Sequence, residues 1–263
     1  MTHAVLLARP ESFDAVALSK VIGQFKNIPS IDAVVEAKQS WGVVAESLPE
    51  DRVKALKALL DAAAMPAVVV LTSAIVKIPA PVWIAKIQWG ADRLECRSKK
   101  EEAFVLTKDS LEMIAACAIN EDHTRTIQVR EGPTAGQRIA SMGIMMATGL
   151  PIHIGPKSQT IEKKEHRSEL LFFLDLFERE RKLHLRIDAQ KFDYSFLKEK
   201  KQYSVLMNMK TLLRELAAFA PAAAQSRGTQ ILLKDKPIVE MGYQSLDDLD
   251  RESRWLLTLK NAL

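Results

Sequence analysis

The stretch AVLLARPESFDAVALSKVIGQF (residues 4–25) decides the fold of the N-terminal part of the chain. Its first five residues are apolar and predict a short buried strand. Ser12 follows in the position of a helix N-cap, because its hydroxyl can accept a hydrogen bond from a free amide of the first turn. The apolar residues that then recur at helical spacing are Leu18, Val21, Ile22 and Phe25. The stretch therefore predicts a strand followed by an amphipathic helix.

The residues that follow continue this pattern of short elements, so that a first module is expected over residues 1–73. Residues 31–37 and 41–46 resemble two strands around KQS, which favours a hairpin. Ser47 and Glu50 have capping-box spacing and Pro49 suits a first turn, so a second helix is expected there. AVVVL (residues 67–71) predicts another buried strand. The resulting order, βαββαβ, predicts a ferredoxin-like sandwich with both helices on one face of a four-stranded sheet.

That fold leaves the function of the module open. A sheet that recognises RNA stacks bases on exposed aromatic residues of its central strands. Trp41 is the single aromatic residue in the strands concerned, so RNA recognition through this sheet is not expected. A small-molecule sensor or a protein docking surface remains open.

A second module is expected over residues 80–220, after a connector stiffened by two prolines. Short strand-like runs follow one another, and DSLEMIAACAI fits a strand or a helical turn; a helix from residue 161 competes with a strand there. The strand-like runs are VWIAKIQW, RLECRS, EAFVLT, RTIQVRE, SQTIEKK, ELLFFLDLF and KLHLRID. Residues 204–220 then form an amphipathic helix. The order predicts an antiparallel β barrel or sandwich closed by a helix, as in pleckstrin-homology-like (PH-like) domains.

Residues 221–263 are expected to form a C-terminal helical extension. A helix over residues 222–233 is interrupted near Arg227, and a capped helix starts at Ser245, with Trp255, Leu256 and Leu259 as its anchors. The whole chain is thus expected to be α+β: a ferredoxin-like sandwich, then a barrel-like module, closed by C-terminal helices.

Composition indicates an ordinary globular chain with a small positive balance. Its 37 basic and 33 acidic residues give a net charge of +4, mostly interleaved along the sequence. Cys96 and Cys117 suggest two thiols in a reducing compartment. The N-terminus has no signal-peptide pattern and no apolar run is long enough for a membrane span, so a cytoplasmic protein is expected.

The stretch EGPTAGQRIASMGIMMATGLPIHI (residues 131–154) contains the clearest candidate for an anion site. Its glycines are too close together for a Walker loop and Gln137 stands in place of the lysine. A generic anion site at a helix N-terminus remains, with Gly132, Thr134, Gly136 and Arg138. Residues 139–154 read as a buried helix, with a partner-binding or membrane-touching face as the alternative.

A second candidate site is a basic surface around residues 179–201, which hold eight basic and four acidic residues. Such a surface can meet an acidic partner, and aromatic residues among lysines suit such contacts. The residues of this candidate surface are Arg179, Arg181, Lys182, Tyr194, Lys198, Lys200, Lys201 and Tyr203. The alternative is that the aromatic rings point inward while the lysines are solvated.

Catalytic and metal-binding patterns are weak. Glu162, His166 and Glu169 would share one face if their segment were helical, and could then hold a metal; as a strand it would disperse them. No GxSxG elbow is present. We therefore expect no catalytic residue, no metal and no cofactor.

The sequence favours a non-enzymatic interaction or scaffold protein that acts through protein–protein contacts. A small-ligand-responsive regulator is the alternative, and an enzyme assembled from distant residues is the third choice. A protein is the favoured partner, ahead of nucleic acid or anionic lipid.

Overall fold

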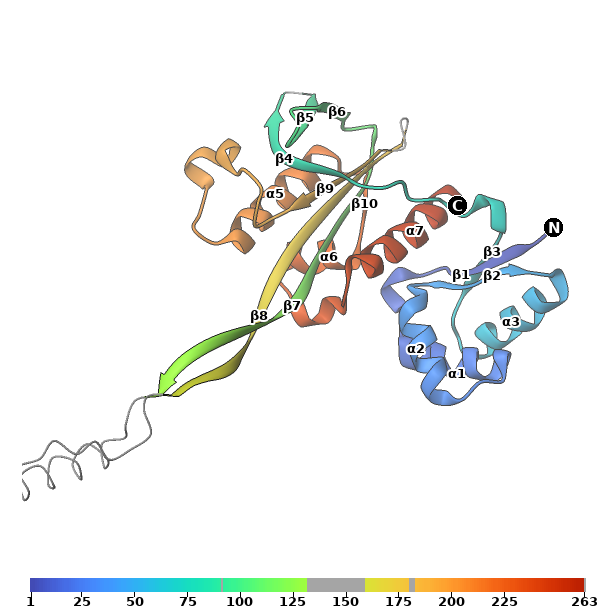
Figure 1. The fold of residues 1–263 in the computed structure, drawn as a ribbon. Coiled ribbons are helices and arrows are strands. Elements are labelled where there is room, and N and C mark those ends of the chain that lie inside the picture. The colour runs from blue at the N-terminus through green and yellow to red at the C-terminus, as the bar shows by residue number, and fades with distance from the viewer. Residues whose placement is uncertain (91, 132–158, 180–182, 263) are drawn as a thin grey trace, which may run out of the picture. The chain divides into compact units, whose positions relative to one another are not determined.

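Figure 1 shows the computed structural model of the chain, which describes residues 1–90, 92–131, 159–179 and 183–262. The protein is a mixed α+β molecule with two sheets. It divides into two compact units: Met1–Ile119 with Leu171–Leu263, and Asn120–Leu170. The described helices and most of the sheet residues belong to the first unit.

The N-terminal sheet has three strands in the order β2-β1-β3, both neighbours being antiparallel to the central strand. Its strands are β1 (His3–Leu7), β2 (Val43–Leu48) and β3 (Ala67–Leu71). The helices are α1 (Ala15–Lys26), α2 (Ser30–Ser40) and α3 (Glu50–Ala62), and Figure 1 shows them gathered on one side of this sheet. The central strand is the most buried, because it has a neighbour on each edge as well as the helical layer.

The predicted hairpin at residues 31–46 is wrong in its first half, and the four-stranded ferredoxin-like sheet is not formed. Residues 31–37 lie in helix α2, so one strand is missing. Ile31 and Val35, which suggested a strand, are exposed, whereas the small Ala33 and Ala37 are buried. A Cβ placed on Gly23 of α1 would lie 3.4 Å from Ala33 Cβ, so the two helices pack closely through small residues.

Both predicted helix caps also differ. Asp14, and not Ser12, caps α1: its Oδ1 accepts hydrogen bonds from the amides of Val16 and Ala17. A short 3-10 turn, η1 (Pro10–Ser12), occupies the residues before it. The N-cap of α3 is Pro49, with no side-chain hydrogen bond, so the Ser47–Glu50 capping box is not formed.

The second sheet has seven strands in the order β10-β7-β8-β9-β4-β5-β6. Its two edges are separate strands, so the described residues form an open sheet and not the predicted barrel. Two neighbouring pairs are parallel, β4 with β9 and β10 with β7. The strands are β4 (Val82–Trp89), β5 (Arg93–Ser98), β6 (Ala103–Thr107), β7 (Leu111–Glu131), β8 (Gln159–Glu178), β9 (Leu183–Asp188) and β10 (Ala224–Gln225).

Most strand predictions in this part are confirmed, and the two ambiguous segments are both strands. DSLEMIAACAI contributes to β7, and the segment from residue 161 belongs to β8. Because β8 is a strand, the helical grouping of Glu162, His166 and Glu169 does not form. In β4, a register shift between Ile84 and Lys86 interrupts the alternation, which is why Ile84 and Ile87 are both buried.

The C-terminal region, after β9, consists mainly of helices. Two predicted helices are confirmed: α5, capped by Ser204, and α7, whose anchors Trp255, Leu256 and Leu259 are all buried. The expected helix over residues 222–233 is shorter and follows the two-residue strand β10. The elements of this region are η3 (Ser195–Lys200), α5 (Val205–Phe219), α6 (Arg227–Leu233), η4 (Ile238–Met241) and α7 (Leu246–Ala262). One further 3-10 turn, η2 (Thr72–Ala74), follows β3 earlier in the chain.

Helix α7 connects the two sheets through hydrogen bonds. The indole nitrogen of Trp255 donates to the carbonyl oxygen of Leu7 in β1 at 2.9 Å. The Lys260 ammonium donates to the carbonyl oxygen of Glu112 in β7 at 3.0 Å. The Trp255 ring lies so close to Gly42 that a Cβ there would be 2.1 Å from it, and Gly42 has a φ of 87°. Glycine is therefore required at this crossing. None of the helices in the described ranges is long and apolar enough to cross a bilayer.

Candidate functional site

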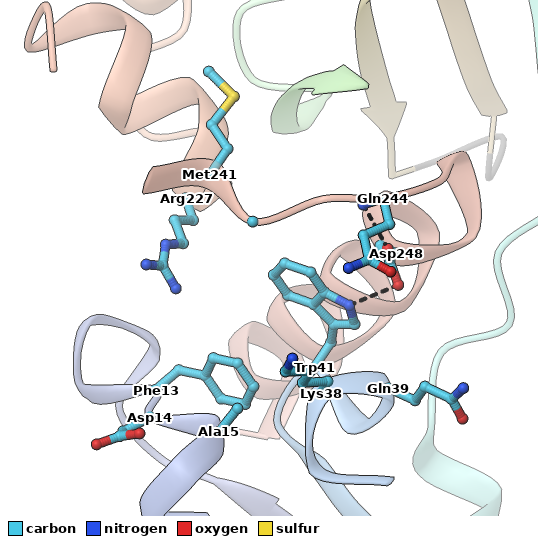
Figure 2. A pocket seen from close by; sticks show the side chains of 11 residues that line it. Phe13, Asp14, Ala15, Lys38, Gln39, Trp41, Arg227, Met241, Gln244 and Asp248 are labelled. Atoms are coloured by element: carbon cyan, nitrogen blue, oxygen red, sulfur yellow. Dashed lines mark hydrogen bonds between the residues drawn. The ribbon is translucent and has the colours of Figure 1, made fainter. Parts of the chain in front are cut away.

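A cavity of about 690 Å³ lies where the start of α1 and the end of α2 meet the C-terminal region. Figure 2 shows this aromatic pocket, whose lining comes from Phe13 and Trp41 on one side and from Arg227 and the η4–α7 connection on the other. Segments more than 180 residues apart in sequence thus build one site. Sites of this kind are usually concave, mostly apolar and supplied with a few polar groups.

Trp41 is the centre of an aromatic stack that forms the wall of the pocket. Its ring is parallel to Phe13 within 13°, with centroids 5.9 Å apart, and to Tyr243 within 16° at 4.8 Å. Its indole nitrogen donates to Asp248 Oδ1 at 2.9 Å, the bond drawn in Figure 2. Trp41 ends α2 in the left-handed conformation (φ 42°), which turns the ring out of the helix. Stacking and hydrogen bonding together hold the wall rigid.

The charged groups of the pocket fall into two kinds. The carboxylates are already engaged: Asp14 caps α1, and Asp248 Oδ2 accepts from the amides of Gln244 and Ser245 at 2.9 and 3.2 Å. The cations are not: within the described ranges, no carboxylate lies at ion-pair distance from Lys38 or Arg227, and both side chains are exposed. The hydrogen-bonding capacity that remains for a ligand is therefore mainly that of cationic donors.

A second hollow of about 400 Å³ adjoins the aromatic pocket and shares Phe13 and Arg227 with it. It adds two cations, Lys234 and Lys236, and its acidic groups include Glu240. Arg227 therefore stands between two cavities and can reach an anionic group placed in either. A ligand larger than a single ring could occupy both.

A buried set of four residues, the hydroxyl cluster (Ser226, Thr229, Tyr243 and Glu252), supports the pocket from behind. The amide of Ala116 donates to Ser226 Oγ at 3.1 Å and to Thr229 Oγ1 at 2.9 Å, and Thr229 donates to the carbonyl oxygen of Ile114 at 3.0 Å. These bonds attach α6 to the edge of strand β7.

The acidic member of the hydroxyl cluster is Glu252 of α7. It accepts hydrogen bonds from the Tyr243 hydroxyl and from the amide of Arg227, the latter at 2.9 Å. Burial raises the pKa of Glu252, although these two donors oppose the shift. Burial and the neighbouring Glu252 raise the pKa of Tyr243 well above its usual range. Tyr243, which stacks on Trp41, is thus held in place by its hydrogen bond to the buried Glu252.

A second set, the ion cluster, consists of the buried Asp175, His184 and Arg186 and the half-buried Asp250. The Arg186 guanidinium donates to both oxygens of Asp175, at 2.7 and 2.6 Å, and to Asp250 Oδ1 at 2.5 Å. Burial opposes the charge of Arg186, but the contacts with Asp175 and Asp250 outweigh it and raise its pKa. Burial also raises the pKa of Asp250, with Arg186 acting against it.

His184 completes the ion cluster from strand β9. Its Nδ1 lies 3.0 Å from the carbonyl oxygen of Pro79 and must carry hydrogen there, because a carbonyl only accepts. Its Nε2 lies 2.8 Å from Asp175 Oδ2 but outside hydrogen-bond alignment, so this is a close polar contact and not a directed bond. The ring also stacks on Phe177, with centroids 4.5 Å apart.

The ion cluster offers three groups that could hold a metal, since one ligand atom each of Asp175, His184 and Asp250 lies within 4.8 Å of the others. The Arg186 guanidinium already contacts both oxygens of Asp175 and one of Asp250, so it occupies the place that a cation would take. The donor set fits a closed ion-pair network, and the residues do not fit a metal.

The residues proposed from sequence for the anion site, Gly132, Thr134, Gly136 and Arg138, lie outside the described residues, as do Arg181 and Lys182. The rest of the basic surface is divided. Tyr194 is buried, whereas Tyr203 is fully exposed. Arg179 lies 3.4 Å from Glu112, and Lys200 pairs with Glu215 at 2.6 Å.

Lys198 and Lys201 are both exposed. Lys198 lies within η3, and Lys201 directly follows it. Beside them is a hollow of about 520 Å³ lined by Trp89, Phe196 and the 3-10 turn. Lys198 has φ 50° and ψ −120°, a backbone conformation that favours glycine. The structure thus brings Lys198 and Lys200 to one hollow, and leaves Arg179 in a separate ion pair.

Sequence reasoning did not find the aromatic pocket. Trp41 was expected in a strand and Arg227 at the interruption of a helix, Phe13 was given no role, and no spacing linked the three. No motif or spacing in the sequence pointed to these residues as one site.

Comparison with protein-family models, curated proteins and solved structures found no match to this chain. Its function must therefore be argued from the geometry of its own sites.

Proposed function

We propose that this protein is a non-enzymatic, ligand-responsive regulator whose aromatic pocket binds a small anion that carries a planar ring. The observation that supports this most is the combination of a fixed aromatic wall with two cations, Lys38 and Arg227, that no described carboxylate pairs. A ring would pack on Phe13 and the edge of Trp41, and a carboxylate or phosphate would accept hydrogen bonds from the cations.

The acidic groups support binding rather than catalysis. Asp14 and Asp248 each accept backbone amide hydrogen bonds, and Asp248 also accepts from Trp41. A general base needs a free basic atom within reach of the substrate proton, and here Asp14 Oδ1 and both oxygens of Asp248 already accept hydrogen bonds.

The test uses the full chain and three probes: AMP, which has a ring and an anion, and adenosine and inorganic phosphate, which have one of the two. Titration calorimetry and quenching of tryptophan fluorescence should show AMP binding more tightly than either part. Arg227→Gln should weaken AMP binding by about tenfold or more, since hydrogen bonds to charged groups contribute about 1.5–3 kcal/mol. Phe13→Ala should weaken both AMP and adenosine.

The matched control is Lys20→Gln, which removes an exposed positive charge from α1 away from the pocket lining. It should bind AMP like the wild type. If AMP and a companion panel of aromatic carboxylates all leave the fluorescence and heat unchanged, the proposal is overturned. Equal loss in Lys20→Gln and Arg227→Gln would show non-specific charge attraction and would also count against it.

We propose as the second candidate a scaffold that binds an acidic protein segment through Lys198, Lys201 and Tyr203. The fully exposed Tyr203 beside Lys198 and Lys201, which form no ion pair within the described part of the chain, and the hollow next to Trp89 favour it. An exposed aromatic ring among cations is a common feature of binding hot spots. A cytoplasmic location is part of both proposals, and the free, buried Cys96 and Cys117 agree with a reducing compartment.

A fluorescent peptide rich in glutamate tests this second candidate by anisotropy. The wild type should bind it at low salt, and the double variant Lys198→Glu and Lys201→Glu should lose that binding. Single-stranded RNA and vesicles containing phosphatidylserine serve as the comparison. If either of these binds more tightly than the peptide, or the double variant binds like the wild type, an acidic protein segment is not the ligand of this surface.

A further inference from the structure

Strand β3 exposes an unused row of backbone groups at the edge of the N-terminal sheet. The amide of Ala8 donates to Pro66, and the amide of Thr72 donates to Thr2, at 2.8 and 3.0 Å. In the same register Leu6 faces Val68 and Ala4 faces Val70. Because hydrogen-bonded pairs alternate along antiparallel strands, the even-numbered residues of β3 bond to β1. The N–H and C=O groups of Ala67, Val69 and Leu71 therefore point to the free edge.

Two of the other edges of the described sheets, those formed by β2 and β10, are protected. Strand β2 is irregular against β1 in two places, and its Ser47 has a φ of 58°, while Glu46 pairs with Arg254. Strand β10 has only two residues. Such irregularities, charges and short lengths are how proteins normally prevent edge pairing.

Strand β3 has none of these features. Its sequence AVVVL contains no charge, proline or glycine, and its pairing with β1 is regular throughout. Val69 and Leu71 are 36% and 44% exposed, although both are large apolar residues. An uncharged, regular and apolar edge is a template for another strand.

We propose that β3 pairs antiparallel with β3 of a second copy of this chain, joining the two N-terminal sheets into one. The outward groups are symmetric about Val69, so a two-fold axis there pairs Val69 with its own equivalent and Ala67 with Leu71 of the second copy. All of these are hydrogen-bonded pairs in the resulting ladder. The largest side chain of the outward set lies opposite the smallest, which avoids crowding across the new strand pair.

A second copy satisfies this edge better than an unrelated peptide because the register and the sizes are self-complementary. The strand carries no charge, so two copies approach without repulsion. A two-fold axis gives the isologous contact that homodimers favour. Pairing of one short strand buries less than the roughly 1,200 Å² of a standard interface, so a weak, concentration-dependent dimer follows. The dimer does not depend on the aromatic pocket or its ligand.

Sedimentation velocity of the full chain, from low micromolar to submillimolar concentration, tests the dimer. The wild type should shift from monomer to dimer over this range. Val69→Lys and Val69→Glu should each remain monomeric, or dimerise at least about tenfold more weakly, because like charges would meet at the two-fold axis. A mixture of the two variants should form a heterodimer, since opposite charges then meet there.

Val69→Thr is the matched control, because it keeps the backbone groups, the shape and the neutrality of the strand, and it should dimerise like the wild type. Val69→Pro removes only an N–H that points outward; it should keep the circular dichroism of the fold and lose the dimer. The proposal is overturned by a wild type that stays monomeric, by a charged variant that dimerises unchanged, or by failure of the mixed variants to associate.

Discussion

The ion cluster and the hydroxyl cluster are both largely buried and both include an acid of helix α7, yet they satisfy that acid differently. Asp250 faces the Arg186 guanidinium, so its charge is met by an opposite charge. Glu252 accepts hydrogen bonds from a tyrosine hydroxyl and a backbone amide, and the positive charge of Arg227 has only a smaller effect on it. Residues two apart on a helix point in different directions. Asp250 of α7 therefore contacts Arg186 of the sheet, whereas Glu252 of α7 contacts the start of α6.

The difference teaches what each cluster does for the fold. The ion cluster joins β8, β9 and α7 by charges that cannot be removed singly, because a buried partner would be left uncompensated. The hydroxyl cluster joins β7, α6 and α7 by hydrogen bonds and close backbone contact. We therefore expect the ion cluster to be sensitive to deletion of a charge, and the hydroxyl cluster to be sensitive to added volume and to pH.

The largest effect should come from Arg186→Met, which leaves Asp175 buried without its guanidinium. Urea unfolding should show a loss of about 3–5 kcal/mol in the free energy of unfolding. The double variant Arg186→Met with Asp175→Asn should lose less than the sum of the two single variants, because the charges are coupled. Additive losses would mean that the two residues do not act as a pair.

The next largest effect should come from Gly228→Ala in the hydroxyl cluster. The added Cβ would lie 1.9 Å from the Ala116 carbonyl oxygen and 2.9 Å from the Tyr243 ring, so α6 must move away from β7. Overpacking of this kind costs about 1–3 kcal/mol in thermal or urea unfolding. Gly242→Ala is the control: it has φ 76° but no atom within 4 Å, so it should show backbone strain alone. A Gly228→Ala variant as stable as Gly242→Ala would contradict this packing.

The pH dependence separates the clusters further. Burial raises the pKa of Glu252, so the folded protein keeps this proton to higher pH than the unfolded chain. The stability from protonated Glu252 is then complete below the unfolded pKa and is lost as pH rises through the folded pKa. Glu252→Gln should remove this loss, seen as a flatter profile of urea midpoints against pH. Parallel profiles for the wild type and Glu252→Gln would show that the protonation of Glu252 is not coupled to folding. Asp250, whose pKa is also raised, is present in both proteins and contributes equally to both profiles.

The smallest effect should come from breaking an exposed ion pair. Its stability loss is the reference for the losses expected in the ion cluster. Lys57 and Asp61 lie 3.1 Å apart on the outer side of α3, with about half of each side chain exposed. Lys57→Gln should change the free energy of unfolding by about 0.5 kcal/mol or less, because solvent screens such pairs. A loss comparable with that of Arg186→Met would mean that burial is not what makes the ion cluster important.

Local periodicity was sufficient to predict much of the fold. The apolar face of α1 and the anchors of α7 could be found from spacing, because each element buries a repeating set of its own residues. It failed at α2, whose large apolar residues are exposed and whose buried contacts are made by alanines. Hydrophobicity there indicated the wrong face, and the close approach to Gly23 that explains it is visible only in three dimensions.

The sequence by itself determined most of the segments that become strands and helices, and the apolar faces of helices such as α1 and α7. Tertiary structure alone decided the open order of the seven strands, the aromatic pocket and both buried clusters. Trp41 and Asp248, 207 residues apart, form a hydrogen bond that no spacing rule could have suggested. The physical reason is that periodicity records how each segment meets the core, whereas a site depends on which distant side chains the folded core brings within a few ångströms.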